Sequence, residues 1–127
     1  MKLADEVQEF IKLHKLINVR DKVLVACSGG VDSMILVHIL IKLKYSIGII
    51  HFDHMTRGLE SLRDREFVGE FALKNNIPFY YKRVNVKAIA DENHQNFQNT
   101  ARNLRYSYFG NILASHGFTK IATAHHS

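Results

Sequence analysis

One junction constrains the fold of this chain more than any other part, because a strand pattern changes there directly into a helix pattern. Residues 23–27 form an apolar run rich in β-branched side chains, which is typical of a buried strand. Gly29 and Gly30 follow, and apolar residues then recur at helical spacing over residues 32–43. A strand that passes at once into a helix is typical of a β-α unit, and β-α units in series build a parallel sheet.

The same junction predicts an anion site. Glycine lets the backbone approach a ligand closely, and the first turn of a helix offers unpaired N–H groups and a positive dipole end. Phosphate is the anion that such sites usually hold. We therefore expect the following segment to bind nucleotide phosphate: Ser28, Gly29, Gly30, Val31, Asp32 and Ser33. No lysine follows the glycines, so the segment lacks the Walker lysine that grips a transferring γ-phosphate. The alternative is a plain turn in which Asp32 or Ser33 caps the helix.

The other apolar patterns repeat this alternation. We expect strands at 23–27, 47–52, 79–84 and 119–124, and helices from about residue 7 and at 32–43, 62–73 and 97–113. Residues 85–96 are polar and are expected to be irregular. The predicted fold is α/β, a Rossmann-like parallel doubly wound sheet with helices on both faces. Such a sheet usually continues where this chain stops, so we expect one domain at 1–127, truncated after the fourth strand.

Composition narrows the function classes. The chain has 127 residues and a net charge of +5, a modest bias towards polyanions such as RNA. Its one cysteine, Cys27, excludes an internal disulfide or a Cys-x-x-Cys pair and is expected to be a buried, inert thiol. The first residues do not read as a signal peptide, and the longest apolar stretch is too short for a membrane span. A cytoplasmic location without membrane contact is the expectation.

Polar residues gather where the second strand pattern ends. His51, Asp53, His54 and Arg57 lie within seven residues and are able to position phosphate, protonate a leaving group or bind metal. On an extended segment, however, the side chains of His51 and His54 point to opposite sides. A metal held by the protein is therefore disfavoured, and we expect none. Solvated loop residues are the alternative interpretation.

The longest predicted helix carries a second basic group. Arg102 and Arg105 are spaced to clamp a phosphate or a phosphate-bearing substrate, although two exposed arginines are the commoner case on any helix. We expect the neighbouring Tyr106, Tyr108 and Phe109 to pack in the core or against the sheet rather than to form a base-stacking platform.

Four segments together resemble the N-type ATP pyrophosphatases and, among them, the tRNA(Ile)-lysidine synthetase family. They are Ser28–Ser33, then His51-x-x-His54 followed by Arg57-Gly58, then Ala101-Arg102-x-x-Arg105-Tyr106, and Ala122-Thr123-Ala124-His125-His126. The first segment is shared by many relatives, and the combination is more specific.

The resemblance implies an adenine nucleotide alpha hydrolase-like catalytic domain that splits Mg²⁺-ATP into AMP and pyrophosphate. ATP would adenylate C2 of the wobble cytidine of tRNA(Ile) with the CAU anticodon, and the amine of L-lysine would then displace AMP. Pyrophosphate would leave into Ser28–Ser33, and the backbone near Ile50 to Phe52 would receive adenine, with His51 and Phe52 as the nucleotide-binding residues there. The expected catalytic residues are His54, Arg57, Arg102, Arg105 and His126. The family's tRNA-binding C-terminal domains are expected to lie outside this sequence, and a homodimer is left open.

Three alternatives stay open. A tRNA thiolase of the same superfamily needs catalytic cysteines or an iron–sulfur cluster, and Cys27 lies on a predicted strand. An amide-forming synthetase shares the glycine segment but not the His-x-x-His-x-x-Arg pattern. A nucleotide-binding module without catalysis is expected to carry its phosphate glycines in a different loop.

Overall fold

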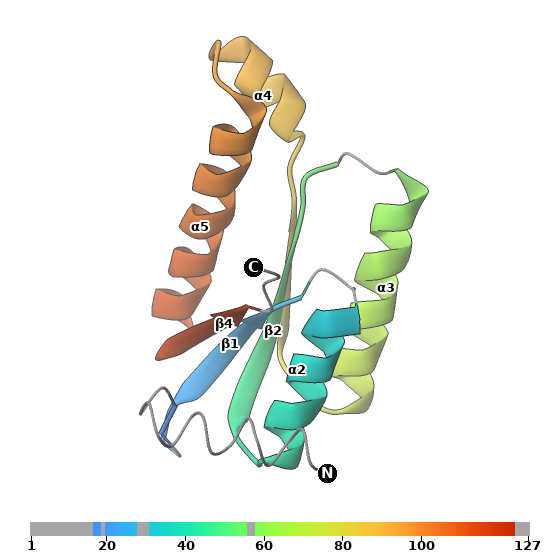
Figure 1. Ribbon diagram of the computed structural model, residues 1–127, viewed down its shortest axis with the longest axis vertical. Helices are drawn as coiled ribbons and strands as arrows, with labels where there is room; N and C mark the ends of the chain where they lie inside the picture. The colour runs from blue at the N-terminus through green and yellow to red at the C-terminus, as the bar shows by residue number, and fades with distance from the viewer. Residues whose placement is uncertain (1–16, 19, 28–30, 56–57, 124–127) are drawn as a thin grey trace.

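The computed structural model describes residues 17–18, 20–27, 31–55 and 58–123, and it is an α/β arrangement around one sheet (Figure 1). The described elements are β1 (Lys22–Ala26), α2 (Val31–Lys42), β2 (Ser46–Asp53), α3 (Leu59–Lys74), β3 (Phe79–Arg83), α4 (Val86–Glu92), α5 (Phe97–Ser115) and β4 (Lys120–Thr123). The helix expected from about residue 7 lies outside the described residues.

The four described strands form a parallel sheet in the order β3-β2-β1-β4. In register, Ala26 of β1 faces Ile50 of β2 and Thr123 of β4, so the carboxyl ends of the strands meet at one edge. Helices α2 and α3 cover one face and α5 covers the other (Figure 1). The predicted parallel, doubly wound sheet with helices on both faces is confirmed.

Alternate residues of the strands supply two separate cores, as expected of strands buried on both faces. On one face, Val23, Val25 and Ile49 pack with α2 and α3; on the other, Leu24 and Ile50 pack with α5. The face of α5 that packs on the sheet includes Phe97, Ala101, Leu104, Tyr108 and Ile112, at the spacing of three and four that a helix requires.

The expectation of irregular structure at residues 85–96 is wrong. Val86–Glu92 is the helix α4, and the Asn85 side chain accepts a hydrogen bond from the Ala88 backbone N–H at 3.1 Å as its N-cap. Val86 and Ala90 are buried while the polar side chains around them face solvent. Two apolar residues one helical turn apart are enough to pack a helix this short. In a segment that is otherwise polar, such a pair gives no recognisable helical pattern.

Candidate functional site at the carboxyl edge of the sheet

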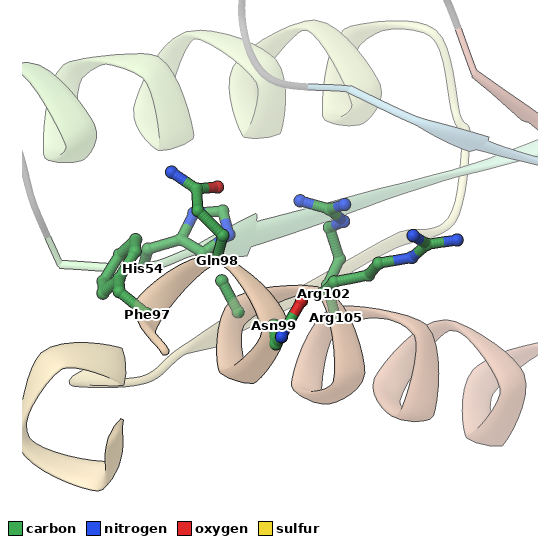
Figure 2. Close-up of a pocket in the computed structure, with 7 residues that line it drawn as sticks. His54, Phe97, Gln98, Asn99, Arg102 and Arg105 are labelled. Carbon is green, nitrogen blue, oxygen red and sulfur yellow. The ribbon is translucent and has the colours of Figure 1, made fainter. Parts of the chain in front are cut away.

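A pocket of about 390 Å³ lies between the end of β2 and the first half of α5. Its lining combines residues from two segments that are more than forty positions apart: His54, Phe97, Gln98, Asn99, Ala101, Arg102 and Arg105. In Figure 2 the imidazole of His54, the amide of Gln98 and both guanidinium groups extend to the same side of α5. The structure therefore brings His54, Arg102 and Arg105, three predicted catalytic residues, into one pocket.

His54 is held by aromatic rings. Its imidazole meets the Phe52 ring edge-on, with centroids 5.0 Å apart, and lies 6.5 Å from the Phe97 ring of α5. The chain turns immediately after it, because an Asp53 carboxylate oxygen accepts from the Met55 backbone N–H at 2.8 Å and Met55 takes a left-handed φ of 62°. His54 is thus fixed at the end of β2 by packing on one side and by an Asp-centred turn on the other.

Arg102 and Arg105 project from the second and third turns of α5. The helix starts at a capped end, where the Asn96 side chain accepts from the backbone N–H groups of Gln98 and Asn99. Both guanidinium groups also lie near the Tyr106 ring, at 5.7 Å and 5.3 Å from its centroid. Two arginines with planar, permanently charged forks beside a histidine make this pocket suited to a phosphate group.

The expectation that Tyr106 packs in the core is wrong, because its side chain is 46% exposed. Position 106 lies four residues after Arg102 and on the same polar flank of α5, away from the face that packs on the sheet. Phe109 is buried and Tyr108 half-buried, as predicted.

Cys27 is the buried thiol that the sequence predicted, at 3% exposure. Burial raises the pKa of the Cys27 thiol to about 12, and a hydrogen bond with the Ser33 side chain lowers that pKa by a smaller amount. A thiol with this pKa is protonated near neutrality and is a poor nucleophile.

His51 lies on the opposite face of β2 from His54, as strand alternation predicted. Its side chain is 5% exposed and its Nδ1 is 2.7 Å from the carbonyl oxygen of Cys27. Phe52, the other residue expected near adenine, is 8% exposed with its ring in the α5-side core. Both side chains are therefore buried in the fold, and the expected contact of this segment with adenine stays a prediction.

Asp53, the residue before His54, has its carboxylate engaged within the fold. One carboxylate oxygen accepts from the Met55 N–H; the other is buried without a hydrogen-bond partner and lies 3.6 Å from Nε of Arg83. Among the described residues no group of three or more His, Cys, Asp or Glu side chains is placed to hold a metal ion. The described side chains alone therefore do not fit a protein-built magnesium cage, which needs several oxygen ligands.

Several predicted site residues are not described. Ser28, Gly29, Gly30, Arg57 and His126 lie outside the described residues, and for Val31 and Asp32 the structure gives the helical backbone of α2 but not the side chains. Ser33, in the first turn of α2, is buried.

Sequence reasoning missed three residues. Gln98 and Asn99 line the pocket, and the signal for them is their place in the first turn of a helix capped by Asn96. Tyr81 of β3 stacks on the His51 ring, with centroids 6.2 Å apart and planes within 9°. No local signal points to Tyr81, because its contact depends on the pairing of β2 with β3.

No helix among the described residues combines the length and the apolar character that crossing a membrane would require.

Comparison with known proteins gives the chain a family. The PP-loop domain family matches residues 2–127. Proteins named tRNA(Ile)-lysidine synthase from Clostridium acetobutylicum and Petrotoga mobilis are each 37% identical to it, over 98% and 95% of this chain. The chain spans 28% and 40% of the length of those two relatives. An NH3-dependent NAD synthetase from Campylobacter jejuni, solved with a nitrate ion, shares the fold with a TM-score of 0.64 at 18% identity, over 95% of this chain and 53% of that one. The chain belongs to the PP-loop domain family.

Proposed function

We propose that this chain is the ATP-cleaving part of an enzyme that joins lysine to the wobble cytidine of tRNA(Ile). The observation that carries the proposal is the pocket in which His54 meets Arg102 and Arg105 beside the carboxyl edge of the sheet. Ligands of open parallel sheets bind at that edge. The names of the relatives, which are tRNA(Ile)-lysidine synthases, supply the substrate class.

The proposed reaction has two steps. In the first, O2 of the wobble cytidine attacks the α-phosphorus of ATP, the bond to pyrophosphate breaks, and the cytidine becomes adenylated. In the second, the lysine amine attacks C2 and AMP leaves with the oxygen. Residues 28–33 would receive pyrophosphate through backbone N–H groups, which agrees with the missing Walker lysine.

The pocket residues would act on the α-phosphate. Arg102 and Arg105, which line the same pocket, would stabilise the negative charge that develops there. His54, held between two aromatic rings, would bind a phosphate oxygen or move a proton to the leaving group. Arg57 and His126 join this set as expectations from the sequence. ATP would enter as its magnesium complex, with phosphate oxygens and water as the main ligands, and no step is assigned to the metal.

The sulfur-transfer alternative needs a reactive thiol. Cys27, the one cysteine of this sequence, is buried and has a pKa of about 12, which is opposite to what a sulfur-transfer nucleophile requires. Cys27 therefore does not supply that thiol, and the names of the relatives favour the lysine reaction.

The test is a pyrophosphate-release assay on the full-length protein with ATP and tRNA(Ile). We expect pyrophosphate release to depend on the tRNA, and completed turnover to require lysine. Turnover that requires a sulfur donor instead would move the chain to the thiolases, and ATP binding without any tRNA-stimulated release would make it a binding module.

A further inference from the structure

The buried side chain of His51 is hydrogen-bonded to Cys27, the residue directly before the glycine segment Ser28–Ser33. His51 Nδ1 is 2.7 Å from the carbonyl oxygen of Cys27, and the side chains involved are at most 5% exposed. A carbonyl oxygen only accepts hydrogen bonds, so Nδ1 carries the proton and donates it. Cys27 directly precedes Ser28, the first residue of the glycine segment.

The far end of the segment is tied to the same residue. The side chain of Ser33, in the first turn of α2, is hydrogen-bonded to the thiol of Cys27 and is 5% exposed. Cys27 is therefore linked through its carbonyl to His51 of β2 and through its thiol to Ser33 of α2, the residue that ends the glycine segment. A displacement of Cys27 would move both anchor points together.

The imidazole plane is fixed from the neighbouring strand. The Tyr81 ring stacks on His51 with a 9° angle between the planes, and the Arg65 guanidinium of α3 lies 4.6 Å from the Tyr81 centroid. Rotation of the imidazole would break this stack, so Nδ1 is directed at Cys27 by packing as well as by the hydrogen bond.

We infer that His51 is a positioning residue for the phosphate-binding segment, acting through its Nδ1–H on the Cys27 carbonyl and not through contact with the nucleotide. The inference rests on the proposed function in that residues 28–33 are taken to bind the phosphates of ATP. Backbone donors stabilise an anion only within a narrow distance range, so a small shift of the backbone at Cys27 weakens every phosphate contact made after it.

Two substitutions of opposite geometry test the inference. In His51→Asn the carboxamide nitrogen is as many bonds from Cβ as Nδ1 is, so the donor to Cys27 is retained. In His51→Gln the carboxamide nitrogen falls near the position that Nε2 of the imidazole occupies. The donor to Cys27 is then lost, while a polar group remains where Nε2 was. If His51 acts by positioning Cys27, Asn should preserve its role and Gln should not. If His51 instead touches the nucleotide through Nε2, Gln should preserve its role and Asn should not.

Equilibrium titration of the full-length protein with ATP gives the first readout. We expect the ATP affinity of His51→Asn to stay within about threefold of the wild type. The affinity of His51→Gln should fall about tenfold, because that variant loses one buried hydrogen bond. Equal affinities, or tighter binding by His51→Gln, would overturn the inference.

Amide hydrogen exchange of the peptide spanning residues 24–36, measured without ATP, gives a second readout that does not depend on the proposed function. Exchange is expected to be faster in His51→Gln than in His51→Asn, and equal rates would overturn the inference even in a protein that binds no ATP. Should His51→Gln not fold, Tyr81→Leu takes its place with Tyr81→Phe as the matched control. Only the leucine variant is expected to speed exchange, and equal exchange in both would again reject the positioning role.

Discussion

Gly48 of β2 occupies a position where a single added methyl group meets a buried ring. A Cβ built at Gly48 would lie 2.4 Å from Cζ and 2.7 Å from Cε1 of Phe118. The Phe118 ring is 4% exposed, and it is confined by the edge of the Tyr80 ring at a centroid distance of 5.8 Å and by Nζ of Lys22 at 4.4 Å. The ring has to move to admit the methyl group, and these contacts restrain that movement.

The sign of Gly48→Ala follows from two opposing terms. Replacing glycine in a strand removes freedom from the unfolded chain and stabilises by about 0.5–1 kcal/mol. Overpacking a closed core costs about 1–3 kcal/mol. We expect the clash to exceed the gain and Gly48→Ala to lower the free energy of unfolding by about 1–2 kcal/mol.

Gly110→Ala is the matched control. Gly110 lies in α5, and a Cβ there meets nothing within 4 Å. With no clash, the helix propensity of alanine alone should raise the free energy of unfolding by about 0.8–1 kcal/mol. The two glycine-to-alanine changes thus have opposite predicted signs.

Urea unfolding followed by circular dichroism measures both effects. Combining Gly48→Ala with Phe118→Leu should recover about 1 kcal/mol relative to the sum of the single changes, because leucine vacates the space of the ring edge. A clash with Phe118 is excluded if Gly48→Ala stabilises the protein as Gly110→Ala does, or if the costs of Gly48→Ala and Phe118→Leu simply add.

Three further predictions concern the site. Arg102→Ala and Arg105→Ala should each lower kcat/KM for tRNA-dependent pyrophosphate release by about 10–100-fold without changing the free energy of unfolding. Arg63 is exposed on α3, and Arg63→Ala should change kcat/KM by no more than about twofold. Comparable losses in all three variants would contradict a pocket role. Asp53→Ala should reduce turnover by about tenfold or more and Asp53→Asn, which keeps the acceptor for the turn after His54, by less; an equal loss in both argues against the turn as the cause. Because burial raises the pKa of Cys27 from 9.0 to about 12, the folded state holds the thiol proton more tightly, and the stability this contributes is complete below pH 9 and lost between pH 9 and 12. Unfolding free energies measured across that range should fall less steeply in Cys27→Ala than in the wild type, and parallel curves would contradict the burial effect.

The order and direction of the elements were predictable because each depends on local pattern. The apolar run before Gly29 and the helical spacing after it predict β1 and α2 without knowledge of any partner. Strand alternation likewise predicts that the side chains of His51 and His54 point to opposite sides. His51 stacks on Tyr81, whose ring lies against Arg65 of α3, whereas His54 lies against Phe97 of α5, and this confirms the prediction.

Three features could not be predicted, one because it depends on strand pairing and two because the local pattern is weak or misleading. The partner of His51 Nδ1 is a backbone carbonyl 24 residues away, reached only because β1 and β2 pair in one register. Helix α4 was missed because its buried residues, Val86 and Ala90, are too few to give a periodic pattern. The prediction for Tyr106 was wrong because an aromatic residue next to a core-facing stripe is usually buried, and here the ring stays exposed beside two arginines.

The proposed function requires that ATP is cleaved at the α-phosphate and that AMP passes through the tRNA. Labelled ATP tests it directly in the full-length protein with tRNA(Ile) and no lysine. Label at the α-phosphate should appear on the tRNA and be released as AMP when lysine is added, while label at the γ-phosphate should appear only in pyrophosphate. Release of ADP and inorganic phosphate, with no α-label on the tRNA at any time, would contradict cleavage at the α-phosphate and transfer of AMP to the tRNA.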